Sequence, residues 1–418
     1  MSAPLTVEEH LAGILAAARP LPAVTTALPQ AFGATLAAPV RAAVDIPVFD
    51  NSAMDGFAVR FADVADATPE RPVTLRVVAD LPAGTADDPP LGPGEAARIM
   101  TGSPAPTSAD AVVPFEDTAG GLADSLDEIS VRHAPRAVGA HIRRRGEDLH
   151  VGDEVLPAGV VLGALQLGAI AAAGVAHVEV APRPRVLVVS TGSELVAPGT
   201  PLRRGQIPES NGTLIAGLVA EAGCVVAHRD SVDDEGPRLR TVLAEFTTGP
   251  EPVDAVIFTG GVSAGAYEVV KNTLAEAMTF TKVAMQPGKP QGFGVTETGT
   301  LLFGLPGNPV SAAVSFEVFV RPALLALQGR RDLHRPVLRL PASLAWRTPP
   351  ARRQYLPAAI DRSDSARWTV RPATAGGSGS HLAGGLARAE AYVVVPAEAD
   401  AVTIGDEVDV MLLGGWVS

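Results

Sequence analysis

The stretch DAVIFTGGVSAGAY begins at Asp254, and the same part of the chain ends in GLPGNP at Pro309. An apolar run, Ala255–Phe258, is followed by a glycine-rich turn and then by a helical pattern. Glycine lets a backbone approach an anion closely, and the start of a helix offers free N–H groups. The stretch therefore predicts a phosphate-binding strand–turn–helix unit, with Gly260 and Gly261 next to the ligand.

Lysine occurs only in this stretch, at Lys271, Lys282 and Lys289, whereas all other cationic residues among the 33 are arginines. A compact ammonium group is not interchangeable with a planar guanidinium. The concentration of lysine in one place favours point charges aimed at an anionic ligand. The alternative is a set of ordinary surface lysines, because charge clusters are usually solvated.

The loop Leu305–Pro309 follows another apolar run and precedes a long helical pattern. Its two prolines restrict the backbone, and Gly307 permits a close approach. A rigid loop at the start of a helix is a suitable place for an anion. The sequence contains no Walker A loop, no G-x-G-x-x-G after a strand and no zinc-ligand spacing, which excludes those kinds of site.

The composition is that of a globular protein with several domains: 418 residues, 47% hydrophobic and 19% charged. The net charge of −13 argues against a general nucleic-acid surface. Cys224 is the single cysteine, which excludes a disulfide within the chain and favours a reducing compartment. The longest uncharged run is short for a bilayer, and Glu8 and Glu9 stand where a signal peptide needs basic residues. We expect a cytoplasmic protein that binds neither nucleic acid nor membrane.

The apolar periodicity changes along the chain. A capped helix is expected at Thr6–Ala18, and Leu156–Gly174 resembles a pair of Ala/Gly-rich helices that we expect to pack against it. Residues 45–140 show short β-like runs without a helical period. From Arg185 to Leu327, apolar strands alternate with helices, as in a doubly wound parallel sheet that binds ligands at the carboxyl ends of its strands. The segment Arg335–Ser418 is again β-rich.

Carboxylates and hydroxyls gather where predicted strands end. The segment Ser190–Glu194 follows one strand, Asp233 follows another, and Glu268 comes after the glycine turn. Hard oxygen ligands beside a phosphate suit Mg²⁺, which keeps several of its waters. This pattern predicts a metal site formed by Glu194, Asp233 and Glu268. Two alternatives remain open: the first segment caps a helix, or the carboxylates form a solvated acidic edge.

Seven motifs, taken in chain order, resemble the molybdopterin molybdenumtransferases, the family of bacterial MoeA and of the E domain of gephyrin. Each motif is moderately specific, and their order along nearly the whole chain makes the resemblance strong. The motifs are DNSAMDGFAV (Asp50–Val59), RIMTG (Arg98–Gly102), RRRGEDL (Arg143–Leu149), VSTGSEL (Val189–Leu195), TGGVSAG (Thr259–Gly265), PGKP (Pro287–Pro290) and GLPGNP (Gly304–Pro309).

The resemblance implies a multidomain α/β and β fold with four regions. Residues 1–44 and 140–175 would form a helical dimerisation region, and 45–139 a β domain. Residues 176–327 would form the doubly wound α/β molybdopterin-binding domain, and 328–418 a C-terminal β-barrel-like domain. A homodimer is also implied, in which the N-terminal β region of one subunit completes the α/β site of the other.

The resemblance also implies a reaction. Molybdenum from molybdate would be inserted at the dithiolene of adenylylated molybdopterin, AMP would be released, and Mg²⁺ would assist. A molybdopterin adenylyltransferase is the expected upstream partner. Lys282 and Lys289 would neutralise the pyrophosphate of the substrate. Matched family positions imply catalytic roles for Asp55, Thr101, Asp148 and Glu194, and substrate contacts from Gly260, Gly261, Ser263, Pro306, Gly307, Asn308, Pro309 and Ser380.

Two positions depart from the family pattern: Gln286 stands where lysine is common, and Glu268 stands where aspartate is usual. An adenylyltransferase is an alternative function, because those enzymes share the α/β domain and its glycine turn. They lack DNSAMDGFAV and RRRGED, which argues against this alternative. A pterin-binding scaffold is a non-enzymatic alternative, but the chain has no disordered linker to support it.

Overall fold

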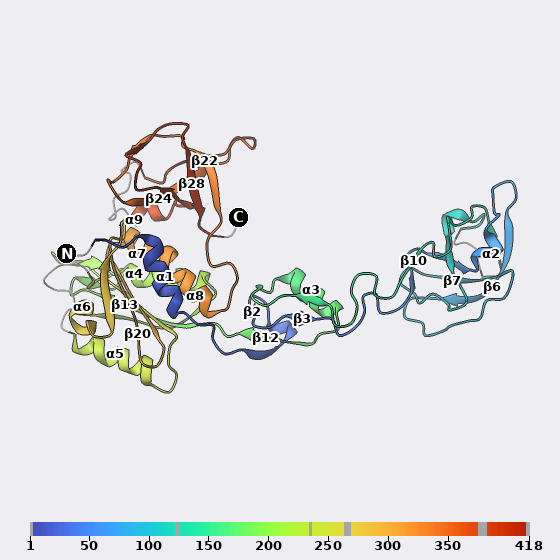
Figure 1. Ribbon diagram of the computed structural model, residues 1–418, viewed down its shortest axis with the longest axis horizontal. Coiled ribbons are helices and arrows are strands. Elements are labelled where there is room, and N and C mark those ends of the chain that lie inside the picture. Colours follow the sequence, from blue (N-terminus) through green and yellow to red (C-terminus); the bar gives the residue numbers. More distant parts are fainter. Residues whose placement is uncertain (1–2, 122–125, 234–235, 263–268, 375–382, 415–418) are drawn as a thin grey trace.

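The computed structural model describes residues 3–121, 126–233, 236–262, 269–374 and 383–414. The molecule is elongated (Figure 1). An α/β region and a C-terminal β region lie at one end, a small middle region follows, and a β domain lies at the other end. The chain runs out to the β domain and returns, so the outgoing strand Val24–Ala27 pairs with the returning strand His177–Ala181.

The β domain is a sheet with strand order β8-β5-β7-β6-β9. In β5, Phe57 and Val59 pack into one core cluster while Ala58 packs into another, because successive side chains point to opposite faces of a strand. The predicted β-rich segment is thus confirmed. Its elements are β5 (Gly56–Val59), α2 (Phe61–Val64), β6 (Val73–Leu81), β7 (Glu95–Ile99), β8 (Ala111–Pro114), η2 (Phe115–Asp117) and β9 (Glu128–Val131).

The middle region differs from the expectation of a helical region. It holds a single α-helix, α3, among strands, because Pro157 and Gly159, the latter with φ +84°, interrupt the apolar run before residue 163. The predicted helix pair is therefore wrong. The elements are β1 (Val24–Ala27), η1 (Leu28–Gln30), β2 (Thr35–Leu36), β3 (Val40–Arg41), β4 (Asn51–Ser52), β10 (Ile142–Arg143), β11 (Glu154–Leu156), α3 (Ala164–Ala172) and β12 (His177–Ala181).

The N-terminal helix α1 (Val7–Ala17) has the predicted capping box between Thr6 and Glu9. We expected α1 to pack against Leu156–Gly174 of the middle region, but it packs elsewhere. Val7 and Ile14, one heptad apart, bury the same face of α1 in the core of the α/β region, beside Phe319. Tertiary packing of this apolar face thus decides where α1 lies.

The α/β region is a six-stranded sheet of order β16-β13-β17-β21-β20-β18, in which the first four strands are parallel. In β13, Val186 and Val188 face α1, α4 and the long helix, while Leu187 and Val189 face α5 and α6. Helices therefore cover both faces, which confirms the predicted doubly wound sheet. The elements are β13 (Arg185–Thr191), β14 (Leu195–Val196), β15 (Ile207–Pro208), α4 (Asn211–Glu221), β16 (Val225–Val232), α5 (Pro237–Thr248), β17 (Ala255–Thr259), α6 (Val269–Leu274), β18 (Met278–Lys282), β20 (Pro290–Val295) and β21 (Leu301–Leu305).

The long helix consists of α7 (Pro309–Ser315), a π-helical turn η3 (Phe316–Val320) and α8 (Arg321–Leu327). It is long and apolar enough to cross a membrane by length and composition alone, but 89% of it is buried inside the structure. Its apolar composition is therefore explained by its position as the central helix of the α/β core.

Where the structure describes it, the C-terminal region is all β apart from one short helix, as expected, and its main sheet has the order β19-β24-β26-β28-β22. Strand β19 (Met285–Gln286) comes from the α/β region in sequence but pairs in parallel with β24. A strand from the α/β region thus forms the edge of the main C-terminal sheet. The other elements are β22 (Val337–Pro341), β23 (Trp346–Arg347), β24 (Arg353–Asp361), β25 (Thr369–Pro372), α9 (Ala383–Leu386), β26 (Ala391–Val395), β27 (Ala401–Val402) and β28 (Glu407–Leu412).

Candidate active site

A cavity of about 820 Å³ opens at the carboxyl ends of β13, β17 and β21, the edge where parallel sheets of this type bind ligands. Loops after all three strands line it, together with the start of α4 and the loop after β19. The predicted residues Gly260, Gly261, Glu194, Lys289, Pro306, Gly307, Asn308 and Pro309 all line this cavity.

Two glycine positions let the loops of the cavity touch. Gly260 has φ +90°, and a Cβ there would lie 2.7 Å from the carbonyl oxygen of Thr191. A Cβ at Gly307 would lie 3.5 Å from the Cα of Gly260. The three loops are therefore packed backbone against backbone, and a side chain at Gly260 would push them apart.

Among the described residues, two carboxylates line the cavity. Glu194 turns its carboxylate back over Gly192, where a Cβ would lie 2.5 Å from Oε2. Glu209 is held by Ser190 Oγ, which donates to its Oε1 at 2.8 Å, and by the N–H of Gly212 at 2.6 Å. No helix follows Ser190–Glu194, because β14 begins at residue 195, so the helix-capping alternative for this segment is wrong.

Among the residues that the structure describes, the cavity has two cationic side chains, Lys289 and Arg352. Lys289 was predicted. Lys282 is exposed at the end of β18 and does not line the cavity, although it was expected to contact the same ligand as Lys289. The carbonyl of Lys282 instead accepts the N–H of Leu5 at 2.9 Å, so this segment anchors the N-terminus.

The other predicted ligands fall in three places. Ser263, Glu268 and Ser380 lie outside the described residues. Asp233 follows β16 and does not line the cavity. Asp55 precedes β5 and Thr101 follows β7, in the β domain at the end of the molecule opposite to the α/β region (Figure 1), and Asp148 lies between β10 and β11. A single chain therefore brings the predicted binding loops together around Glu194. It does not bring Asp55, Thr101 and Asp148 to the same cavity.

Asp55 and Thr101 form a pair of their own. Asp55 Oδ1 accepts the N–H of Thr101 at 2.6 Å and its Oγ1–H at 2.7 Å. These two hydrogen bonds hold the pKa of the exposed Asp55 carboxyl below its usual value, and the bond from the hydroxyl has the larger effect. The side chain is thus an ionised acceptor presented to solvent.

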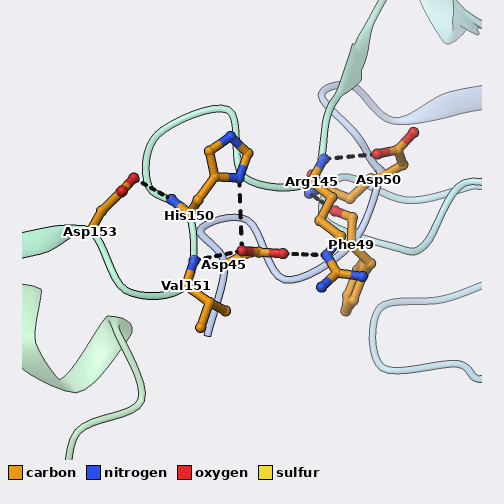
Figure 2. A network of polar contacts seen from close by, with 8 residues as sticks. Asp45, Phe49, Asp50, Arg145, His150, Val151 and Asp153 are labelled. Carbon is orange, nitrogen blue, oxygen red and sulfur yellow. Dashed lines mark hydrogen bonds and ion pairs between the residues drawn. The ribbon is translucent and has the colours of Figure 1, made fainter. Parts of the chain in front are cut away.

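Asp148 lies in the narrow neck between the middle region and the β domain, where its N–H donates to the carbonyl of Ile46 at 2.9 Å. A polar network fixes the two chain segments of this neck (Figure 2). Asp45 accepts a hydrogen bond from the N–H of Val151 at 2.8 Å and forms an ion pair with Arg145. Both contacts lower the pKa of Asp45, and the bond from Val151 has the larger effect. Asp148 therefore lies in a connecting segment that hydrogen bonds and an ion pair hold in place, and it does not line the cavity.

Sequence reasoning missed Glu209, Asn211 and Arg352 as lining residues, whereas Gln286, singled out as a departure from the family pattern, does line the cavity. The run PESNG at Pro208–Gly212, a turn just before a helical pattern, was a usable signal for the first two. Asn211 Nδ2 donates to the carbonyl of Gly307 at 2.6 Å, and its buried Oδ1 has no hydrogen-bond partner in the part of the chain that the structure describes. It is an acceptor suited to a ligand N–H.

The oxygen donors of the cavity determine whether it can hold Mg²⁺. No three His, Cys, Asp or Glu residues among those described are grouped closely enough to hold a metal. Glu194 and Glu209 nevertheless place hard oxygen donors in the cavity. Mg²⁺ is usually bound by one or two carboxylates together with substrate phosphates and water, so the cavity fits the ion when a phosphate-bearing ligand is present.

Comparison with known proteins identifies the family. The model described as "MoeA N-terminal region (domain I and II)" matches residues 5–174, "Probable molybdopterin binding domain" matches 187–326, and "MoeA C-terminal region (domain IV)" matches 339–413. Molybdopterin molybdenumtransferase 2 of Mycobacterium tuberculosis is 43% identical over 416 residues, which cover 97% of this chain and 98% of that protein. This chain belongs to the MoeA family. The molybdopterin molybdenumtransferase of Staphylococcus aureus is 33% identical over 414 residues, covering 98% of this chain and 96% of that protein.

Solved structures of the MoeA family support the fold. A crystal structure of the molybdopterin biosynthesis MoeA protein from Pyrococcus horikoshii has a TM-score of 0.81 and 29% identity, covering 99% of this chain and 100% of that chain. A second structure of that protein has a TM-score of 0.82 at 25% identity. The resemblance seen in the seven motifs and the multidomain α/β and β fold class are both confirmed. The relatives from Mycobacterium tuberculosis and Staphylococcus aureus are transferases by name.

Proposed function

We propose that this chain inserts molybdenum from molybdate into adenylylated molybdopterin and releases AMP. The observation that carries the proposal is the cavity itself, in which the loops after β13, β17 and β21 meet Lys289 and Arg352. Closely approaching glycine backbone and two cations suit a pyrophosphate group. The names of the relatives supply the class of reaction.

Five of the residues that line the cavity have roles in this proposal. Lys289 and Arg352 bind the pyrophosphate, and Asn211 Oδ1 accepts an N–H of the pterin or adenine. Glu194 and Glu209 would hold Mg²⁺, which when bound would supply stabilisation of charge on the phosphoryl oxygens. Water adds to one phosphorus of the pyrophosphate as the bridging P–O bond breaks; AMP leaves with the bridging oxygen or with the new hydroxyl group, and the proton of the water passes to solvent.

The working unit in this proposal is a homodimer with composite sites. The β domain that carries the ionised Asp55 lies far along the molecule from the cavity of its own chain (Figure 1). In a two-fold dimer, each β domain can cover the cavity of its partner, which gives two equivalent sites. Asp55 and Thr101 would then orient molybdate or the attacking water. A cytoplasmic location and supply of substrate by a molybdopterin adenylyltransferase belong to the same proposal.

The test is a molybdate-dependent AMP-release assay with adenylylated molybdopterin. Wild-type protein should release AMP only when molybdate and Mg²⁺ are present, and Glu194→Ala should lose turnover while unfolding at an unchanged temperature, because a rim carboxylate contributes little to stability. Absence of molybdate-dependent release would refute the proposal. Formation of adenylylated molybdopterin from ATP and molybdopterin would favour the adenylyltransferase alternative instead.

A further inference from the structure

The cavity has one cationic side chain that comes from the C-terminal region. Arg352 stands just before β24, and its Nη1 donates to Oε1 of Gln286 at 2.9 Å. Gln286 ends β19, at the start of the loop that carries Lys289. Both Gln286 and Arg352 line the cavity and both are half-buried. The hydrogen bond therefore links two regions of the fold across the wall of the site.

The backbone on which Gln286 stands is fixed from two sides. Strand β19 pairs with β24, with Met285 opposite Arg353 and Gln286 opposite Gln354. The loop that follows is held by the buried Gln291, whose Nε2 donates to the carbonyl of Gly288 at 2.6 Å and to Ser315 Oγ at 2.7 Å. Gln286 thus presents its amide oxygen from a rigid frame, whereas an arginine side chain is long and loses much rotamer freedom when it is ordered.

The hydrogen bond between Arg352 and Gln286 matters because the cavity contains acidic side chains as well as cations. Glu194 and Glu209 are acidic, so an anionic ligand depends on the cations that face it. A neutral amide can hold the guanidinium of Arg352 without cancelling its charge, which a carboxylate at the same position would do. Arginine has five N–H donors in a planar fork, and the bond to Gln286 leaves donors for a phosphate.

We propose that Gln286 is a positioning residue that orients Arg352 toward the diphosphate group of the ligand, so that the C-terminal region supplies part of the anion site. This inference rests on the proposed function only in naming a diphosphate as the bound group. Gln286 acts through Arg352 and does not itself have to touch the ligand.

A double-mutant cycle tests the proposal. Binding of inorganic pyrophosphate is measured by calorimetry at low salt for wild type, Gln286→Met, Arg352→Gln and the double variant. Methionine keeps the length of the glutamine and removes the acceptor. Arg352→Gln should weaken binding about tenfold or more, because a charge-assisted contact is lost. Gln286→Met should weaken it about two- to tenfold, the usual cost of ordering one long side chain. In the double variant, Gln286→Met should add nothing to the loss caused by Arg352→Gln.

The controls separate positioning from a general structural role. Gln286→Met should unfold at the wild-type temperature, and Arg371→Gln, an exposed cation in the same region that does not line the cavity, should bind pyrophosphate as wild type does. Additive losses in the double variant, no loss in Gln286→Met, or no pyrophosphate binding by wild type would each overturn the inference. AMP release is scored separately, so coupled binding without turnover would refute the proposed function and leave this inference standing.

Discussion

Asp55 and Thr101 are joined twice, since the backbone N–H and the hydroxyl of Thr101 both donate to Asp55 Oδ1. The hydroxyl bond is the largest cause of the lowered pKa of Asp55. A carboxyl with a lowered pKa stabilises the folded state above its ordinary pKa, and this contribution is lost as the pH falls through the folded value. The pair thus keeps Asp55 ionised to a lower pH than an ordinary aspartate.

Thr101→Val should raise the pKa of Asp55 toward its ordinary value, because the hydroxyl donor is lost while the backbone donor remains. The pKa is measured by NMR titration of the Asp55 side-chain carboxyl. Thr107→Val is the matched control, since the hydroxyl of Thr107 donates to Asp88 elsewhere in the same domain. An Asp55 pKa that is equal in Thr101→Val and in wild type would contradict the assignment.

Lys289→Ala should weaken binding of inorganic pyrophosphate about tenfold or more, because losing a charge-assisted contact costs about 1.5–3 kcal/mol. Lys282→Ala is the control, because Lys282 carries the same charge and is also exposed but does not line the cavity. Its loss should change affinity less than about twofold, and the difference should shrink at high salt. Equal losses in both variants, measured by calorimetry, would restore the original expectation that both lysines contact the ligand.

The binding loops were predictable from the sequence because each is a local pattern. The turn at Gly260–Gly261 and the loop Leu305–Pro309 each follow an apolar strand, and parallel strands bring such turns to one edge. Arg352 was not predictable in this role, because it reaches the cavity through a strand pairing between two regions. The same limit explains α1, whose capping box was recognised but whose packing partner, the long helix of the α/β core, lies about three hundred residues later in the chain.

His10 makes the stability of the protein pH-dependent. It is buried in α1 with its ring edge-on to Phe319 at 4.8 Å, and burial lowers its pKa from 6.5 to about 4. The unfolded chain therefore binds a proton at higher pH than the folded chain does, so stability falls as the pH drops from 6.5 to about 4. The loss attributable to His10 should approach about 3 kcal/mol. Replacing His10 with phenylalanine keeps a ring and should remove this part of the pH dependence in urea unfolding; parallel curves for the two proteins would refute it.

Glu317 holds the junction to the C-terminal region. Its buried carboxylate accepts two hydrogen bonds from Arg335, at 2.9 and 3.0 Å, and lies near Arg321. Glu317→Gln should lower the free energy of unfolding by up to about 3–5 kcal/mol, because it leaves the partly buried guanidinium groups of Arg335 and Arg321 without a counter-charge. Glu251→Gln, which breaks an exposed pair with Arg185, is the control and should cost about 0–1 kcal/mol. Denaturant unfolding that ranks the two variants equally would contradict this account.

The composite dimer is tested most directly by complementation between two inactive variants. Asp55→Ala and Glu194→Ala are mixed under conditions that allow subunits to exchange, and molybdate-dependent AMP release is measured. In a mixed dimer with shared sites, one site keeps both residues, so activity should return to about a quarter of the wild-type level under statistical mixing. A mixture that stays inactive after exchange has been verified, or a protein that sediments as a monomer at the assay concentration, would contradict the account.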